Sequence, residues 1–225
     1  MPLAPAHPAV VLPIARLGLP LSALVVGAVA PDAPVYLPVG VSYARTHRWE
    51  GLPAVVAMSL LALWLWSALV RDALVDLTPP LRRRLSAHAR LGRRAWLLAP
   101  LAVAIGAATH LLWDSATHEW GFIVRGNAFL GETYGPIPAY RWLQHTSTVV
   151  GTLVVAGYGL RQLGRRPVAP RPSAMPHAAY WLAAVPVAAL IVGISLRSPE
   201  AGVGAALLAL CVVAIIWRAM RQPSA

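Results

Sequence analysis

The chain has 225 residues, of which 58% are hydrophobic and 12% are charged, and its mean hydropathy is +0.62. Soluble domains carry about 25% charged residues, so this composition argues against a soluble protein and predicts an all-α, polytopic helical bundle within a membrane. The formal charge is +11, and all nineteen basic residues are arginine. Because the arginines cluster in short loops between apolar segments, we expect membrane lipid as a partner and no nucleic acid.

The first apolar segment, residues 8–30, supports two interpretations. It is long enough to cross a membrane as one helix, which would place His7 on the cytoplasmic side, far from Asp32. Alternatively, the break at Gly18–Pro20 divides it into two short helices, because proline ends helices. The bent pair would return His7 to the face that carries Asp32. We favour it, since it adds His7 to a group of candidate metal ligands.

Further apolar segments bring the expected total to five or six membrane segments. They run through residues 52–70, 95–113, 146–160, 179–196 and 202–217. The loops between them alternate in charge: residues 71–94 carry seven arginines and residues 161–178 carry four, whereas residues 30–51 and 114–145 carry two each. The positive-inside rule then places the arginine-rich loops and the C-terminus in the cytoplasm, and the other two loops outside.

Composition also suggests a division of the chain. We expect a membrane-embedded domain with a candidate metal site over residues 1–166, a Pro-rich linker over 167–178, and a two-helix membrane anchor over 179–225. The N-terminus lacks a basic region and a small-residue cleavage site, so we expect no cleaved signal peptide. The single cysteine, Cys211, has no partner for an internal disulfide and lies in an apolar run, which indicates a core residue.

The run THLLWDSATHEWG places His110, Asp114 and His118 four residues apart, where an apolar segment ends. Four residues are little more than one helical turn, so the three side chains share a face. His110 and Asp114 can hold one ion, while His118 lies about 12 Å along the axis from His110 and is too far to share it. Asp114 could then bridge two ions. The alternative is a solvated helix end with chance histidines.

Further candidate ligands lie at the N-terminus and in the outward loops. They are His7, Asp32, His47 and His145. Imidazole and carboxylate together suit zinc, iron or manganese, so we expect one or two divalent ions, zinc before iron or manganese. Simpler interpretations exist for three of them: His145 would cap a helix, Asp32 would end a turn, and His47 would lie in a plain loop.

The order of these residues carries a resemblance. With the phrases PDAP at 31–34 and THRWEGL at 46–52, it resembles the bacterial membrane branch of the zinc-dependent phospholipase C and single-strand nuclease superfamily, which comprises predicted membrane-bound metal-dependent hydrolases. THLLWDSATHEWG, and RWLQHTSTVVG at 141–151, are more similar still to one uncharacterised sub-branch, a domain-of-unknown-function family. The resemblance covers roughly residues 1–160.

The resemblance implies roles for the candidate ligands. One zinc would be held by Asp32, His47, His110 and Asp114, and Asp114 would be the bridging carboxylate and a catalytic residue. A second zinc would use His7 together with the N-terminal amine.

A third zinc of the resembled family would use His118, His145 and an acid one turn further on. This chain has Val149 at that place, so Glu119 or Glu132 would have to supply the carboxylate. We therefore count Glu119 among the candidate catalytic residues.

These observations predict a membrane-bound metal-dependent hydrolase at the outer face of a bacterial cytoplasmic membrane, acting on a small or lipid-linked ester or phosphodiester. A bound ion would lower the pKa of a water molecule toward about 7. Arg125 and Arg141 lie on the same side of the membrane and are candidates for binding an anionic substrate group. The alternatives are an iron oxidoreductase with His and Asp ligands and a non-enzymatic membrane metal-binding protein.

Overall fold

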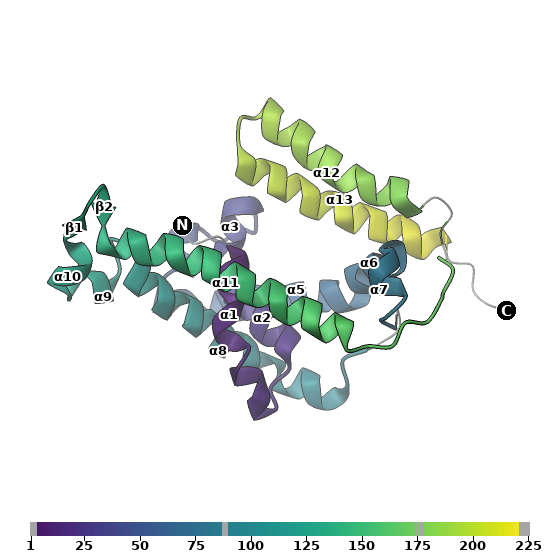
Figure 1. The fold of residues 1–225 in the computed structure, drawn as a ribbon, viewed down its shortest axis with the longest axis horizontal. Coiled ribbons are helices and arrows are strands. Elements are labelled where there is room, and N and C mark those ends of the chain that lie inside the picture. The colour runs from purple at the N-terminus through teal and green to yellow at the C-terminus, as the bar shows by residue number, and fades with distance from the viewer. Residues whose placement is uncertain (1–3, 87–89, 174, 176–177, 221–225) are drawn as a thin grey trace. The chain divides into compact units, whose positions relative to one another are not determined.

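The computed structural model describes residues 4–86, 90–173, 175 and 178–220, and over these residues it is helical apart from one short hairpin (Figure 1). The α-helices, in chain order, are α1 (Pro8–Val11), α2 (Leu21–Val29), α3 (Ala33–Tyr36), α4 (Tyr43–Thr46), α5 (Leu52–Leu65), α6 (Arg71–Leu77), α7 (Pro79–Arg82), α8 (Arg93–Thr117), α9 (Phe122–Arg125), α10 (Ala128–Gly131), α11 (Ala139–Gly164), α12 (Ala178–Ser195) and α13 (Pro199–Met220). The 3₁₀ turns are Ala4–Ala6, Ile14–Leu17, Ala30–Asp32 and Trp49–Gly51, and a π-helical turn spans Trp66–Val70. The antiparallel strands are β1 (Thr133–Tyr134) and β2 (Ile137–Pro138). The all-α prediction is confirmed.

Within the described residues, three helical segments are long and apolar enough to cross a membrane. They are Trp49–Leu77, Arg93–Arg125 and Pro199–Met220. They indicate that the protein associates with a membrane, but they are fewer than the five or six segments expected. The first apolar segment breaks into short helices, and α11 begins at Ala139, so it takes in the polar residues Arg141 and Gln144.

The first apolar segment bends where the sequence predicts. Gly18 has a φ of 85°, in the left-handed region that glycine adopts without steric cost, and its N–H bonds the carbonyl of Ala15. Pro20 then precedes the first turn of α2. The chain folds back at this bend, so that α1, which precedes it, contacts both α2 and α8. The single straight span is therefore excluded, and the bent pair is confirmed.

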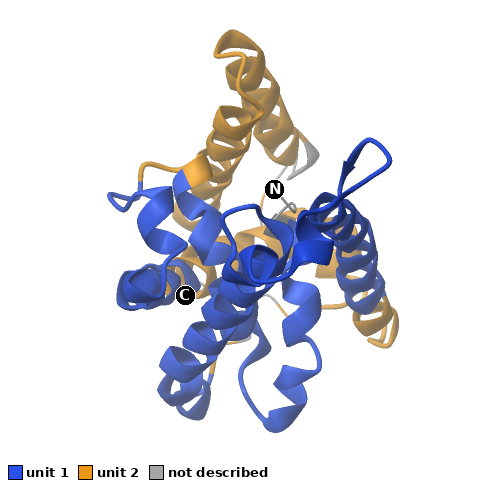
Figure 2. Ribbon diagram, turned by 90° about the vertical axis from the view of Figure 1, so that its left-hand side faces the viewer, with its two compact units in different colours: residues 1–34, 39–63, 92–160 blue, residues 35–38, 64–91, 161–225 orange. Residues whose placement is uncertain are grey.

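The described residues fall into two compact units (Figure 2). The first is drawn from residues 1–34, 39–63 and 92–160, and the second from residues 35–38, 64–91 and 161–225. The expected boundary at the Pro-rich linker does not coincide with this division, since residues 64–91 group with the C-terminal helices. Residues 174 and 176–177 of that linker, and 221–225 of the expected anchor, lie outside the described residues.

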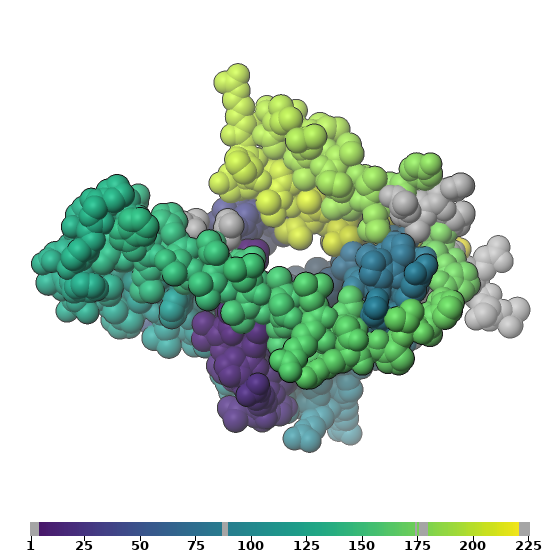
Figure 3. Space-filling view, in the orientation of Figure 1, coloured from purple at the N-terminus to yellow at the C-terminus, as the bar shows by residue number. Residues whose placement is uncertain are grey.

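The second unit is built around the antiparallel pair α12 and α13, which pack side by side (Figures 1 and 3). Its buried core consists of Ala73, Leu77, Met175, Val213, Ala214 and Trp217. The indole N–H of Trp217 donates to Asp76 across 2.8 Å. Asp72 forms ion pairs with Arg71 and Arg90 at 2.8 and 2.9 Å, so this acid offsets part of the arginine charge of its loop.

Candidate metal centre

The first unit is organised by a close contact between α2 and α8. A Cβ atom added to Gly27 would collide with the backbone of Val103, and one added to Gly106 would collide with the carbonyl of Leu24. Small residues let helix backbones approach this closely, which is a common way of packing helices in membranes. The approach brings the carbonyl of Ala28, on α2, within reach of the side chains of α8.

Five ionisable side chains meet at this contact, at the end where α2 stops. They are His7 before α1, Asp32 in the 3₁₀ turn after α2, His47 after α4, and His110 and Asp114 on α8. None exposes more than 9% of its surface. Charged groups are almost never buried this deeply unless they are paired or bind a metal. The burial of these five side chains therefore indicates that they pair with one another or bind a metal ion.

Hydrogen bonds fix the orientation of two of the rings. His110 Nδ1 lies 2.8 Å from the carbonyl oxygen of Ala28, and His47 Nδ1 lies 3.0 Å from that of Tyr43. A carbonyl can only accept, so both Nδ1 atoms donate, and the Nε2 atom of each neutral ring carries a lone pair. The two Nε2 atoms are 3.2 Å apart. Metal-binding histidines are typically held in this way, with the far nitrogen donating to a carbonyl.

Two carboxylate oxygens complete a group of four donor atoms. Asp32 Oδ1 lies 3.4 Å from His47 Nε2 and 3.7 Å from His110 Nε2, and Asp114 Oδ2 lies 3.4 and 3.3 Å from the same two atoms. Zinc binds nitrogen and oxygen at about 2.0–2.1 Å in a tetrahedron, whose corners are then about 3.3–3.4 Å apart. Four of the five separations, including the one between the two rings, lie at 3.2–3.4 Å and match that spacing, whereas Asp32 Oδ1 is slightly further from His110 Nε2.

The other oxygen of Asp114 faces a different histidine. Asp114 Oδ1 lies 3.6 Å from His7 Nε2, and within the described residues neither atom has a hydrogen-bond partner. The ring of His7 stacks on that of His110 at a centroid distance of 3.8 Å. Buried polar atoms without partners are rare, and a cation between these two would satisfy both. The carboxylate of Asp114 thus faces two possible ion positions, as expected of a bridging ligand.

The loops that carry Asp32 and His47 are tied together by one hydroxyl group. Thr46 Oγ1 donates to the carbonyl of Pro31 across 2.7 Å, and this bond is buried. Because Pro31 precedes Asp32 and Thr46 precedes His47, the bond helps to set the spacing of these two candidate ligands.

Burial and charge act in opposite directions on two of the histidines. Burial, reinforced by the neighbouring His110, lowers the pKa of His7 to about 4, so this ring is neutral at pH 7. Burial also acts to lower the pKa of His47, but hydrogen bonds to Asp114 and Asp32 outweigh it and raise that pKa to about 9. A metal ion that binds His47 must therefore displace a proton.

The remaining predicted ligands lie at the edge of the cluster or away from it. His118 Nδ1 is 3.6 Å from Asp114 Oδ1, but its Nε2 is 3.2 Å from the amide nitrogen of Gln144, which donates to it. His118 therefore contacts the carboxylate and is held by α11. His145, the next residue after Gln144, is exposed, and the structure does not bring it to the cluster.

The acids and arginines that the sequence suggested in the loop at 114–145 also lie outside the cluster of histidines and aspartates. Glu119 is exposed just beyond α8, and Glu132 accepts a hydrogen bond from Tyr134 at 3.1 Å, so neither carboxylate joins the cluster. Arg141 is exposed at the start of α11, whereas Arg125 lines a pocket that reaches the cluster.

Comparison with known proteins identifies the family. Residues 1–222 match the family model described as a domain of unknown function, DUF4184. The chain belongs to the DUF4184 family. No curated protein and no solved structure matches it.

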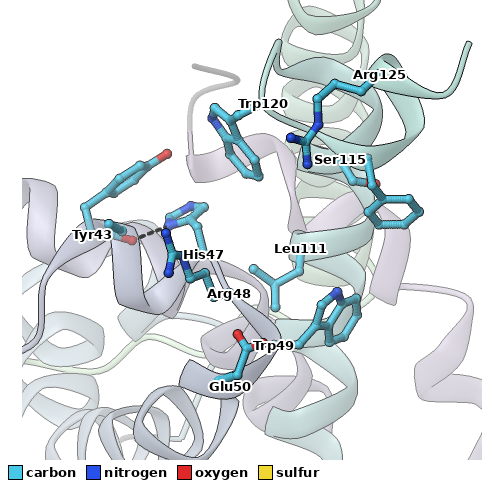
Figure 4. A pocket seen from close by; sticks show the side chains of 11 residues that line it. Tyr43, His47, Arg48, Trp49, Glu50, Leu111, Ser115, Trp120 and Arg125 are labelled. Atoms are coloured by element: carbon cyan, nitrogen blue, oxygen red, sulfur yellow. Dashed lines mark hydrogen bonds between the residues drawn. The ribbon is translucent and has the colours of Figure 1, made fainter.

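The cluster of this DUF4184 protein opens to the surface at His47, which lines a pocket of about 640 Å³ (Figure 4). Arg48, Trp49 and Glu50 form one wall, and Arg125 approaches from the opposite side. The pocket reaches the cluster through His47, the one of its five residues that lines the pocket.

Several residues of the site have only a weak signal in the sequence. Gln144 and Thr46 are ordinary polar residues, and the carbonyls of Ala28 and Tyr43 depend on backbone position alone. Only the phrase THRWEGL, where Arg48 follows a candidate ligand, could have indicated a pocket residue.

Proposed function

We propose that this protein is a membrane-bound metal-dependent hydrolase that acts on an ester or phosphodiester, with zinc as its preferred ion. The main support is that carboxylate oxygens of Asp32 and Asp114 lie 3.3–3.7 Å from the Nε2 atoms of His47 and His110 in a buried site, a spacing close to that of donor atoms around one zinc ion. The unsatisfied pair of His7 Nε2 and Asp114 Oδ1 supports a second ion.

The chemistry would be divided between the ions and the protein. Bound divalent ions lower the pKa of water and stabilise negative charge on a phosphoryl or carbonyl oxygen. Asp114 would hold two ions close together, and the neutral ring of His7 offers its lone pair at pH 7. Glu50 places a carboxylate in the wall of the pocket that His47 also lines, and it would be the group to accept a proton there.

We place the site at the outer face of the bacterial cytoplasmic membrane, with the C-terminus in the cytoplasm. The support is the distribution of arginine, which favours the loops at 71–94 and 161–178 over those at 30–51 and 114–145. A substrate could then reach the pocket from the outer leaflet or from the aqueous phase.

Hydrolysis of chromogenic esters by the purified protein in detergent tests this function. Bis-(p-nitrophenyl) phosphate and p-nitrophenyl acetate should be compared before and after chelation and after zinc is added back. We expect turnover of at least one ester that chelation abolishes and zinc restores, and that is lost in Asp32→Asn. Turnover that survives chelation, or no turnover by zinc-loaded protein, contradicts a metal-dependent hydrolase. Bound iron with oxygen consumption would instead favour an oxidoreductase.

A further inference from the structure

The pocket beside His47 carries positive charge from two arginines that take no part in the buried cluster. Arg48 and Arg125 both line it, and within the described residues neither guanidinium group forms an ion pair or a hydrogen bond through its side chain. Glu50 also lines the pocket but is not paired with either arginine. Two arginines against one carboxylate leave a positive charge at the entrance to the site.

The two arginines come from different elements and approach one space. Arg48 follows α4, next to the ligand His47, whereas Arg125 ends α9. Figure 4 shows Arg125 extending down from the upper right, beside Ser115, and Arg48 lying below His47. Guanidinium groups bind phosphate through paired, charge-assisted hydrogen bonds, and a pair of them can enclose one phosphate group.

The walls between the arginines are aromatic and apolar. Trp49, Trp120 and Phe122 line the pocket, each with a large exposed ring, and Leu111 lies between them. Tryptophan and arginine together are typical of the headgroup level of a membrane, where rings contact hydrocarbon and guanidinium groups contact phosphate. A polar anion attached to an apolar group would match both surfaces.

From this arrangement we propose that the pocket binds a phosphate group, that Arg48 and Arg125 hold it beside His47, and that the substrate is therefore a phosphate ester and not a carboxylic ester. This inference rests on the proposed function, because it assigns the substrate class of the same site. The phosphate can belong to a lipid headgroup or to a water-soluble ester, and both would present the same anion to the two arginines.

The binding of inorganic phosphate to the full-length, zinc-loaded protein in detergent tests the proposal by titration calorimetry. We expect Arg48→Gln and Arg125→Gln each to weaken phosphate binding about tenfold or more, because each removes a charge-assisted hydrogen bond. Arg45→Gln is the matched control, since Arg45 is exposed, lies three residues from Arg48 and is outside the pocket. It should bind phosphate as the wild type does.

A second titration, with a water-soluble short-chain phosphatidic acid, distinguishes the two sources of phosphate. If the lipid binds more tightly than inorganic phosphate, the pocket is assigned to lipid headgroups; if the two bind equally, it is assigned to soluble phosphates. Either result supports the phosphate site when Arg48→Gln and Arg125→Gln weaken the binding. Wild-type affinity in both variants, or an equal loss in Arg45→Gln, overturns the proposal. The metal content of the same samples is also measured. If phosphate binding depends on the two arginines but the protein holds no metal, the phosphate site is supported and only the hydrolase function is contradicted.

Discussion

Asp114 places each of its two carboxylate oxygens against a buried histidine. Its Oδ2 atom lies 3.4 Å from His47 Nε2 and 3.3 Å from His110 Nε2, and its Oδ1 atom faces His7 without a hydrogen bond among the described residues. A single carboxylate that contacts three buried imidazoles is poorly explained by packing and well explained by a bridge between two cations.

Replacing Asp114 with asparagine should remove the metal while preserving the size of the side chain. The amide is a weaker ligand and would turn a donor toward imidazole lone pairs, so we expect zinc affinity to fall about a hundredfold or more. Competition with a chelating dye measures this. Glu119→Gln is the control, because Glu119 is exposed outside the cluster and its removal should leave zinc affinity unchanged. Full zinc affinity in Asp114→Asn would rule out the bridging role.

The protonation of His47 predicts a pH dependence of metal binding. Its pKa is raised to about 9, so below that pH a metal ion must displace a proton, and zinc affinity should rise about tenfold per pH unit between about pH 6.5 and 8. His7 adds no dependence in this range, because its lowered pKa of about 4 leaves it neutral. Calorimetry in buffers of different ionisation enthalpy should show about one proton released per first zinc bound. An affinity independent of pH would contradict this protonation state.

The sequence could identify the candidate ligands one by one, but it could not identify the residues and carbonyl groups that orient them. His7, Asp32, His47, His110 and Asp114 are recognisable because buried histidine and aspartate are scarce in apolar chains. The positions of Gln144 and His145 were not predictable. Adjacent residues on a helix point about 100° apart, so which one faces the cluster depends on the rotation of α11, and that rotation is set by packing.

Among the elements, the contact of α2 with α8 decides whether the candidate ligands meet. Gly27 and Gly106 leave no room for a side chain between the two helices, and the carbonyl of Ala28 then reaches His110. Glycine costs a helix about 1 kcal/mol relative to alanine, so its use at both positions is explained by close approach and not by helix stability.

A larger residue at Gly106 should push α2 away from α8 and weaken the metal site. We expect Gly106→Leu to lower the melting temperature by about 5 °C or more and to reduce zinc content, because overpacking costs about 1–3 kcal/mol and the helices must separate. Gly157→Leu is the control, since a Cβ atom on Gly157, in α11, meets open space. Retention of both stability and zinc in Gly106→Leu would show that this contact does not position the site.

Helices and turns could be predicted from the sequence where glycine, proline or a long apolar run marks them. The bend at Gly18–Pro20 follows from glycine and proline, and the helix that carries His110 follows from the apolar run at 95–113. The length of α11 and the hairpin that precedes it did not follow. The segment at 146–160 is only part of a 26-residue helix that starts at Ala139, after β1 and β2 reverse the chain at Gly135, whose φ is 71°.

At the scale of the whole molecule, the arginine distribution predicts an orientation that chemical labelling can test. In a Cys211→Ser background, a membrane-impermeant maleimide should label Glu119→Cys in intact cells, but should label Arg166→Cys only after the membrane is permeabilised, because the positive-inside rule places residue 166 in the cytoplasm. Both positions are exposed on the protein surface, so a difference in labelling reports the side of the membrane and not burial within the protein. The reverse pattern would move the metal site to the cytoplasmic face.

The most direct test of the account is the metal content of the wild-type protein. The full-length chain should be purified in detergent without added metal, checked for cooperative thermal unfolding, and analysed by inductively coupled plasma mass spectrometry. Two overlapping triads of buried donor atoms, one from His7, His110 and Asp114 and one from Asp32, His47 and His110, predict one to two equivalents of zinc per chain. A folded protein that contains no divalent or transition metal, and gains none when zinc is added, would contradict the metal centre and with it the proposed hydrolysis.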